Sequence, residues 1–300
     1  MSTAITFSEY GAPEVLRLSE AAVPEPGPGQ VRIRVRAASV NPLDMKIRSG
    51  LMARIMPARF PKILGLDAAG VVDAVGEDAD AAVGDEVLGA TAGGSYGEYA
   101  LLERPVAKPA ALSWEVAASL VTVGQTAARV LDQLGVRAGQ TLLIHGAAGS
   151  VGVIAVQLAA ARGITVIGTA AERDVERVTA LGATAVRYGD GWVERVMAAA
   201  PAGVDHVFDA SGAGVLADSV ALTGDSAKII TIADMSAAQD GVRFSAGTAE
   251  DGQFLPELVH LAAAGRITVP IWRTYPLAEA AKAHADLEAR RNQGKAVLLP

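Results

Sequence analysis

The stretch LLIHGAAGSVGVIAVQLA, residues 142–159, decides the fold. An apolar strand runs directly into Gly146, Gly149 and Gly152, and helix-forming residues begin at about Val151. Glycine allows a tight turn and a close backbone approach because it has no Cβ. A helix N-terminus presents unpaired N–H groups and the positive end of its dipole at such a turn, which suits a phosphate. The stretch therefore predicts a strand, a glycine turn and a helix that bind a phosphorylated ligand.

The glycine spacing is GxxGxxG and not the GxGxxG of the usual dinucleotide fingerprint, so the stretch alone also fits an ordinary turn of an α/β domain. The sequence that follows repeats the strand-helix pattern. The expected strands lie at residues 164–169, 183–188, 205–211 and 228–234, with amphipathic helical segments between them. This alternation is typical of a doubly wound parallel sheet. We therefore predict a Rossmann dinucleotide-binding domain whose glycine turn, with Ser150 and Val151, holds the pyrophosphate.

The first third of the chain has the pattern of β structure. Short β-branched or alternating runs, such as VRIRVRAASV (31–40), are separated by clusters of glycine and proline, such as PEPGPGQ (24–30). Many short strands with this punctuation predict a barrel or a sandwich. Helical spacing begins near Ser113, a residue type favoured at helix N-caps, and the final strand-like segment is expected to return to the first domain. The expected domains are 1–112 with 267–300, and 113–266.

Composition excludes several classes of function. The net charge is −7 and no run of basic residues stands out, which disfavours nucleic-acid and membrane-surface partners. The polar N-terminus lacks the order of a signal peptide and no apolar stretch approaches 18 residues, so we expect a cytoplasmic protein. The absence of cysteine excludes disulfides, thiol catalysis and thiolate metal sites. The four histidines share no short ligand spacing, so no zinc is expected: His145, His206, His260 and His284.

The second expected strand addresses the choice between NADPH and NADH. Enzymes that use NAD usually place an acid at the tip of this strand, where it accepts from the ribose 2′-OH. Here the strand ends in Gly168 and Thr169. Thr169 can donate to a 2′-phosphate and Arg173 can pair with it. Glu172 lies about where the acid would be sought, or else belongs to the first turn of the next helix, and Arg173 is otherwise a solvated helix charge. NADPH is favoured over NADH.

Several motifs along the whole chain resemble one family. In order, they are YGAPEVL, NPLDMKIRSG (41–50), PKILGLDAAGVV, VGDEVLG, GGSYGEYALL, GQTAARVL, HGAAGSVG, VFDASG and the terminal GKAVLLP. As a set they resemble the zinc-free quinone oxidoreductase branch of the medium-chain dehydrogenase/reductases, the zeta-crystallin-like enzymes. The resemblance implies an α/β chain in which both ends form a GroES-like catalytic domain. It also implies a Rossmann domain inserted between them, and a cofactor in the cleft between the two.

The sequence departs from the zinc-dependent relatives of this family. Those carry a cysteine before the NP-like segment and a His-Glu pair after the glycine of the PxxxG segment, where this chain has Leu66 and Asp67 after Gly65. Without a Lewis acid, hydride reduction of an electron-poor acceptor is the chemistry that suffers least. We therefore predict metal-independent reduction of quinones or α,β-unsaturated carbonyls by NADPH. The alternatives are an enoyl-thioester reductase and a non-catalytic, NADPH-binding redox sensor.

The resemblance also implies residues near the acceptor. Asn41 of the NPxD segment is expected to face the nicotinamide, where its amide can donate to a carbonyl oxygen; the alternative is a turn cap before Pro42. Lys46 stands where many quinone reductases have tyrosine, and contributes to acceptor binding or is a surface charge. Thr126 is expected to contact the nicotinamide ribose or carboxamide, or to bond back within its helix.

Further cofactor contacts are expected at the carboxyl ends of strands and in the tail. Strand ends gather the ligands of open α/β sheets. The expected contacts there are Ser211, Gly212, Thr231, Ile232 and Ala233, and the tail adds Lys295 and Arg291 as 2′-phosphate candidates. We expect His145 to be a packed strand-end histidine and Asp209 to be structural. A homodimer is expected, with the strand-like segment 241–246 as the pairing edge.

Overall fold

The computed structural model describes residues 1–289 and 293–300. The chain divides into two compact units. The first unit contains Met1–Thr122, Leu255–Gly265 and Val269–Pro300, and the second contains Val123–Phe254 and Arg266–Thr268. Helix α7 (Leu255–Ala263) lies in the first unit, whereas the sequence analysis assigned its residues to the Rossmann domain. The expected domain limits stay a prediction.

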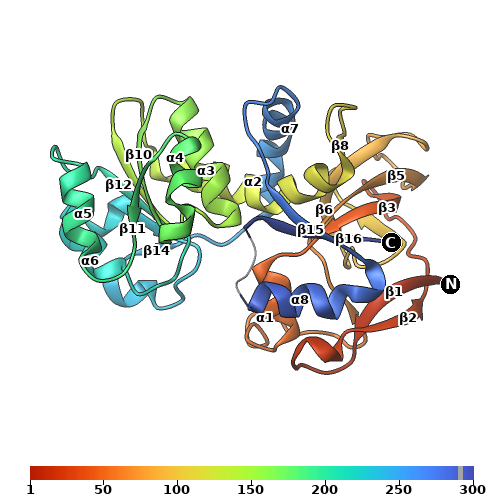
Figure 1. Cartoon of the computed structure of the whole chain (residues 1–300). Coiled ribbons are helices and arrows are strands. Elements are labelled where there is room, and N and C mark those ends of the chain that lie inside the picture. Colours follow the sequence, from red (N-terminus) through yellow and green to blue (C-terminus); the bar gives the residue numbers. More distant parts are fainter. Residues whose placement is uncertain (290–292) are drawn as a thin grey trace. The chain divides into compact units, whose positions relative to one another are not determined.

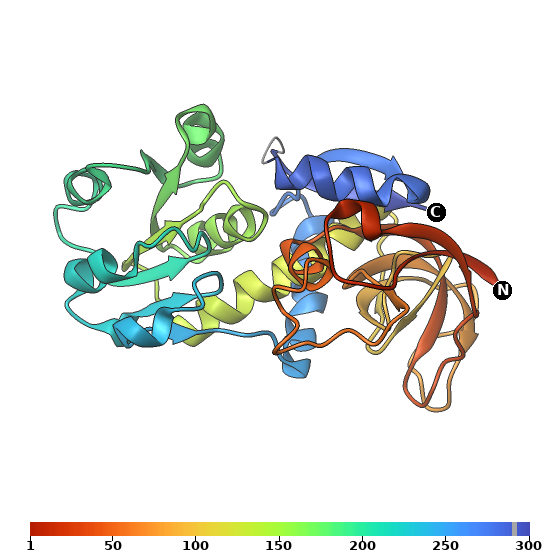
Figure 2. The ribbon, with the colours of Figure 1, turned by 90° about the horizontal axis from the view of Figure 1, so that it is seen from below.

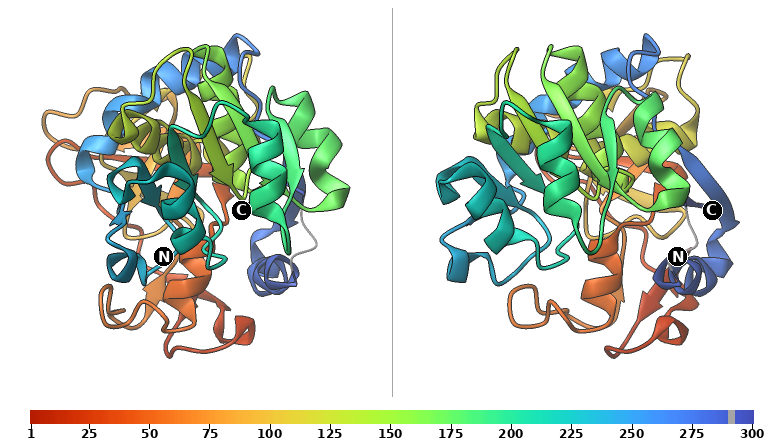
Figure 3. Two further views of the ribbon diagram at one scale, coloured as in Figure 1. Left: turned by 90° about the vertical axis from the view of Figure 1, so that its left-hand side faces the viewer. Right: turned by 60° about the vertical axis from the view of Figure 1, so that its left-hand side comes forward.

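The second unit is built on a six-stranded sheet with the order β11-β10-β9-β12-β13-β14. Every adjacent pair is parallel, and Figure 3 shows the strands edge-on with helices on both sides. The order is that of a doubly wound dinucleotide-binding sheet. The strands are β9 (Thr141–His145), β10 (Thr165–Ala170), β11 (Thr184–Arg187), β12 (His206–Asp209), β13 (Ile229–Thr231) and β14 (Arg243–Phe244). The expected α/β class with a doubly wound parallel sheet is confirmed.

Helices cover both faces of this sheet because its strands are apolar on both sides. They are α3 (Ser150–Ala161), α4 (Val175–Ala180), α5 (Trp192–Ala199) and α6 (Leu216–Thr223). On one face Val196 of α5 and Leu216 of α6 join a core with Leu143 and Ile167. Gly168, next along β10, leaves room for α4, because a Cβ there would lie 3.0 Å from Val178.

The first unit contains a small closed barrel. Its seven-stranded sheet runs β15-β16-β3-β5-β6-β7, β8 pairs with β6, and an additional pairing of β7 with β3 closes the barrel. The strands are β3 (Val31–Ser39), β5 (Asp67–Val75), β6 (Glu86–Ala92), β7 (Tyr99–Leu102), β8 (Val106–Ala107), β15 (Ile271–Pro276) and β16 (Lys295–Leu299). A separate sheet of order β2-β1-β4 contains β1 (Ser2–Phe7), β2 (Arg17–Ala21) and β4 (Lys62–Ile63).

The two ends of the described chain meet in this unit. Strand β16 is antiparallel to β3, with Val297 opposite Ser39. Helix α8 (Ala280–Glu288) lies beside the short 3₁₀ turn η1 (Pro13–Val15), as Figure 2 shows. Residues from both ends therefore build one core. The remaining α-helices are α1 (Pro42–Arg48) and α2 (Trp114–Leu134), both labelled in Figure 1. The remaining 3₁₀ turns are η2 (Glu172–Asp174), η3 (Ser226–Lys228), η4 (Ala237–Asp240), η5 (Ala249–Phe254) and η6 (Leu277–Glu279).

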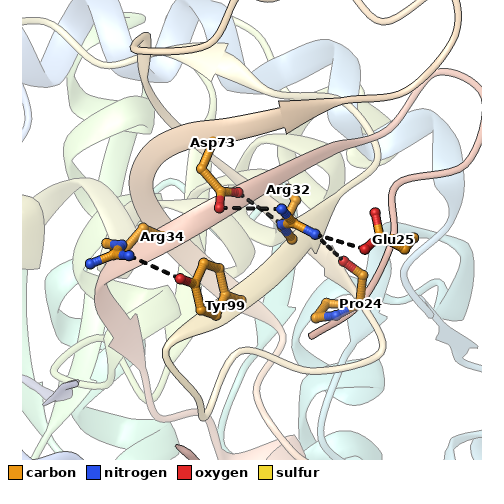
Figure 4. Close-up of polar contacts among 6 residues, drawn as sticks. All are labelled: Pro24, Glu25, Arg32, Arg34, Asp73 and Tyr99. Atoms are coloured by element: carbon orange, nitrogen blue, oxygen red, sulfur yellow. Dashed lines mark hydrogen bonds and ion pairs between the residues drawn. The ribbon is translucent and has the colours of Figure 1, made fainter. Parts of the chain in front are cut away.

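Alternation along β3 puts arginines on the outer face of the barrel (Figure 4). Arg32 donates through Nε to Asp73 on β5 at 2.9 Å and through Nη1 to the Pro24 carbonyl at 3.1 Å. Arg34 donates to the Tyr99 hydroxyl on β7 at 2.9 Å. The polar face of the barrel is thus joined by hydrogen bonds between neighbouring strands.

Across the part of the chain that the structure describes, no helix has both the length and the apolar character to cross a bilayer.

Candidate cofactor and acceptor sites

The glycine turn joins β9 to α3 in the second unit. Gly146 has a φ of +74°, a left-handed conformation that favours glycine. A Cβ on Gly152 would lie 2.2 Å from the Gly146 carbonyl oxygen, so only glycine fits there. Gly149 is the N-cap of α3, and Ser150 and Val151 begin the helix. The first N–H groups of a helix have no intrahelical acceptor, so this turn presents donors to an anion.

A buried histidine, His145, and its hydrogen-bond partners hold the glycine turn in place. His145 ends β9, and its two ring nitrogens lie 3.2 Å from the hydroxyls of Thr169 and Ser219. The ring packs edge-on against Trp192 at 4.7 Å. Burial lowers the pKa of His145 to about 4, so the imidazole is neutral at pH 7. The Thr169 hydroxyl also accepts from the Gly146 N–H at 3.3 Å, and it is therefore engaged inside the unit.

The loops after β12 and β13 are organised by Asp209. Its buried carboxylate accepts from the Ser211 N–H at 2.9 Å, from the Gly212 N–H at 3.1 Å and from the Thr231 hydroxyl at 2.8 Å. The Thr231 oxygen in turn accepts from the Ala233 N–H at 3.1 Å. A Cβ on Gly146 would lie 3.3 Å from that of Ser211, so these loops adjoin the glycine turn. Five expected cofactor residues thus gather at the carboxyl ends of β12 and β13: Ser211, Gly212, Thr231, Ile232 and Ala233.

The end of β10 carries the residues expected to select the cofactor. Glu172 and Arg173 lie in η2, directly after the strand. The Glu172 carboxylate pairs with Arg187 at 3.3 Å. The Arg173 side chain is 63% exposed, with its Nε 3.7 Å from Asp174. Sequence reasoning missed Arg177, whose Nη2 donates to the Ala148 carbonyl of the glycine turn at 3.1 Å.

The first unit contains a second polar group, at the start of α1. Asn41 is buried, and its Nδ2 donates to Asp67 at 2.9 Å while its Oδ1 accepts from Lys295 at 2.6 Å. Asp67 also accepts from the Ser39 hydroxyl at 2.8 Å and from the hydroxyl of Thr122. Asn41 occupies the N-cap position before Pro42, so the turn-cap geometry and the side-chain network occur together.

Asp44 completes this group. Its carboxyl accepts from the Asn41 N–H at 2.8 Å and from the Gly65 N–H at 3.1 Å. Burial, with the charge of Asp67, raises the pKa of Asp44 to about 7, against the lowering effect of its backbone donors and of Lys295. Asp44 thus supports the Asn41 segment through two hydrogen bonds.

The other expected residues lie on helices or in the tail. Thr126 is half-buried on α2 and Lys46 is half-buried on α1. Lys295 is buried in β16, where its ammonium group also donates to the Val40 carbonyl at 3.0 Å. Arg291 falls outside the described residues. The roles expected for all the named site residues stay predictions.

An apolar segment after α1 was missed by the sequence analysis. Leu51, Ile55 and Met56 are exposed on the loop that leads to β4. Residues 45–66 contain no acid and five basic residues, so these apolar side chains lie within a basic stretch of the sequence.

Within residues 1–289 and 293–300, no three histidine, aspartate, glutamate or cysteine side chains converge as a metal site requires. The Asn41 group contains an ammonium group, an amide and hydroxyls around its two carboxyls, which is not the nitrogen and sulfur set that zinc prefers.

Comparison with known proteins identifies two family matches and several relatives that span the whole chain. Residues 27–110 match the alcohol dehydrogenase GroES-like domain family and residues 181–298 match the zinc-binding dehydrogenase family. A quinone oxidoreductase of Pseudomonas aeruginosa is 34% identical over 329 residues that cover all of both chains. The structure of Escherichia coli quinone oxidoreductase complexed with NADPH has a TM-score of 0.89 at 29% identity, over 99% of this chain and 100% of that one. That of the Coxiella burnetii quinone oxidoreductase has a TM-score of 0.85 at 32% identity, over 100% and 99%.

Proposed function

Because the chain belongs to the quinone oxidoreductase family of the medium-chain dehydrogenase/reductases, we propose that it reduces quinones or α,β-unsaturated carbonyls with NADPH and without a metal ion. The observation that carries the proposal is the glycine turn. A Cβ at Gly152 would meet the backbone of the turn, so glycine is required for the helix to begin this close to the turn. Such a turn at the start of a helix in a doubly wound sheet fits a pyrophosphate.

The residues of the second unit fit a nicotinamide dinucleotide. When bound, this cofactor supplies the hydride that reduces the acceptor. The N–H groups of Ser150, Val151 and Gly152 are proposed to hold its phosphates. The loops fixed by Asp209 are proposed to hold the nicotinamide end, through Ser211, Gly212, Thr231, Ile232 and Ala233. The NADPH in the structure of the Escherichia coli relative supports a nicotinamide cofactor for this chain.

The end of β10 supports NADPH over NADH. Glu172, the acid that could accept from a ribose 2′-OH, is paired with Arg187. Arg173 is exposed and carries a guanidinium that suits a 2′-phosphate. We propose that Arg173 makes the principal 2′-phosphate contact. Thr169 contributes less, because its hydroxyl is already bonded to His145.

The first unit supports a lipophilic, oxygen-bearing acceptor. Asn41 is proposed to donate an amide N–H to the acceptor oxygen, where negative charge develops during reduction. Leu51, Ile55 and Met56 offer exposed apolar surface in the same unit, which suits a quinone ring. Zinc does not fit the Asn41 group, because the amide oxygen of Asn41 already accepts from the ammonium group of Lys295.

Fluorescence titration of the EDTA-treated protein with NADPH and with NADH tests the cofactor. We expect micromolar NADPH binding and weaker NADH binding. Arg173→Ala is expected to weaken NADPH binding about tenfold, since one charge-assisted contact is lost, and to leave NADH binding unchanged. Arg162→Ala, an exposed arginine of the same unit, is the matched control. Binding of neither nucleotide would refute the proposal.

NADPH oxidation with a panel of quinones, enones and enoyl thioesters then identifies the acceptor. We expect turnover with quinones or enones that added Zn²⁺ does not increase. Turnover with thioesters alone would identify an enoyl-thioester reductase. NADPH binding without any turnover would identify a redox sensor. The expected cytoplasmic location stays a prediction.

A further inference from the structure

Three ionisable side chains of the first unit are buried together around Asn41. Asp44 and Asp67 are fully enclosed and Lys295 is 2% exposed. Burying charges is costly, and a pair of apolar residues of similar volume is often as stable as a buried ion pair. A lysine at position 295 is therefore not explained by stability alone. Its contacts give a more specific reason.

The ammonium group of Lys295 determines which way the Asn41 amide points. An ammonium group has three donors and no acceptor, so the atom 2.6 Å away must be the amide oxygen, Oδ1. The nitrogen then faces the other side, where Asp67 accepts from it at 2.9 Å. A carboxylate accepts only, so the two charged groups impose the same orientation from opposite ends of the amide.

This arrangement leaves one of the two amide hydrogens only weakly bonded. The first N–H of Nδ2 is bonded to Asp67. The remaining contact of this nitrogen is to the Ser39 hydroxyl at 3.5 Å, at the limit of a hydrogen bond. A cation at the oxygen and an anion at the nitrogen also polarise the amide, which strengthens it as a donor.

We propose that Lys295 is a positioning residue that holds and polarises the Asn41 amide so that its second N–H is presented to the oxygen of the acceptor. This inference rests on the proposed function. It differs from the 2′-phosphate role expected for Lys295 from the sequence. The ammonium group is enclosed and bonded to the Val40 carbonyl and to Asn41, and a phosphate would have to displace both.

The test uses Lys295→Met, which has similar length and volume but no charge. We expect kcat for quinone reduction to fall about 10- to 100-fold, less than the roughly 100- to 1000-fold loss when an oxyanion donor is removed outright, because the Asn41 amide is still present but no longer held in place. The KM for the quinone should change less than kcat, because the contact strengthens as charge develops on the oxygen. NADPH affinity should stay within about threefold of wild type.

Two further comparisons separate positioning from folding. Lys108→Met removes another nearly buried lysine of the first unit, which pairs with Glu86 at 2.9 Å; it should lower stability without lowering kcat. Lys295→Arg keeps a cationic donor and should recover part of the lost kcat. It also serves if Lys295→Met does not fold, because a folded arginine variant that is as slow as Asn41→Ala, although it keeps a cationic donor, would overturn the proposal.

A double-mutant cycle gives the decisive measurement. If Lys295 acts through Asn41, the double variant Asn41→Ala Lys295→Met should be no slower than Asn41→Ala alone. Additive losses in kcat, or an unchanged kcat in Lys295→Met, would overturn the proposal. So would a selective loss of NADPH affinity over NADH affinity, which would indicate a 2′-phosphate contact. A wild-type protein that binds NADPH but reduces no acceptor would instead refute the proposed function, and this role with it.

Discussion

Asp44 is a carboxyl group held in a site where ionisation is unfavourable. Burial comes first among the causes of its raised pKa, and the nearby charge of Asp67 adds to it. Two backbone N–H donors and Lys295 act in the opposite direction. The balance leaves the pKa at about 7, so this side chain gains or loses its proton near neutral pH.

We predict that Asp44→Asn changes how stability depends on pH. The unfolded pKa is about 3.9 and the folded pKa about 7, so the folded state binds the proton more tightly. The resulting stability is fully present below about pH 4 and is lost as pH rises through 7. Its total is on the order of 1–4 kcal/mol. Urea unfolding from pH 4.5 to 8 should show the variant gaining stability relative to wild type as pH rises.

The exposed Asp190 supplies the control for this experiment. Asp190→Asn should follow the wild-type dependence across the whole range. A constant difference between Asp44→Asn and wild type from pH 4.5 to 8 would contradict the prediction.

Sequence reasoning reached Asn41 but not the residues that orient it. The NPxD pattern is local, and its Asp44 accepts from the Asn41 N–H within the same turn. Asp67 and Lys295 are 26 and 254 positions away from Asn41 in the chain. Their contacts depend on the pairing of β3 with β5 and with β16. No local pattern encodes that pairing, so the sequence alone offers Lys295 only as a 2′-phosphate candidate, a role that stays a prediction.

The three glycines of the turn between β9 and α3 are needed to different degrees and for different reasons. Gly146 needs a positive φ. Gly152 needs the absence of a Cβ, because the backbone lies 2.2 Å from where that atom would be. At Gly149 a Cβ would lie 3.2 Å from the Gly146 oxygen, close enough to require only a small shift.

We therefore predict that Gly152→Ala and Gly149→Ala have unequal effects. Gly152→Ala should weaken NADPH binding more than tenfold and lower the free energy of unfolding by about 1–3 kcal/mol, because it overpacks the turn. Gly149→Ala should change binding less than about threefold. Fluorescence titration and thermal unfolding of both variants check this. Equal losses in the two variants would show that the helix N-terminus, and not the crowding at Gly152, limits binding.

The parallel sheet was predictable because its strands are short apolar runs between helices. Helix α7 was harder to assign. Its residues follow the last strand of the sheet in sequence, which favours the Rossmann domain, whereas the structure groups the helix with the first unit. An amphipathic pattern shows that a helix has an apolar face, but it does not show which core that face packs against.

At the scale of the whole molecule, the two units should respond differently to acid. In the second unit, burial lowers the pKa of His145 to about 4 and also lowers that of His206. Both therefore contribute stability above pH 6.5 that is lost as pH falls. In the first unit, burial lowers the pKa of His284 to about 3, which also costs stability as pH falls. Protonation of Asp44 stabilises the first unit over much of the same pH range and offsets this loss.

We predict that the second unit unfolds first as pH is lowered from 7. The three tryptophans allow this to be measured, because Trp192 lies in the second unit while Trp114 and Trp272 lie in the first. A Trp114→Phe Trp272→Phe variant reports the second unit, and Trp192→Phe reports the first. The fluorescence change should occur at higher pH in the double variant. Coincident transitions, or an earlier change in Trp192→Phe, would contradict the prediction.

We also propose a homodimer that forms through β14. This strand is the terminal strand of the parallel sheet, and both of its residues are exposed. An open edge of this kind can pair with a second copy. Light scattering should give the mass of a dimer for wild type and of a monomer for Phe244→Asp. Met197→Asp, at an exposed site on α5, should remain dimeric, and a monomeric wild type would refute the assignment.

The pairing of β16 with β3 has a consequence for the order of biosynthesis. All of Val123–Phe254 leaves the ribosome before β16 is made, so most of the second unit is available to fold while the first unit still lacks a strand. At translation rates of about 5–20 residues per second, Lys295 is synthesised on the order of 10–50 s after Asn41. The group around Asn41, which we propose as the acceptor site, is therefore completed last. A nascent chain can acquire its nucleotide-binding sheet well before it can reduce anything.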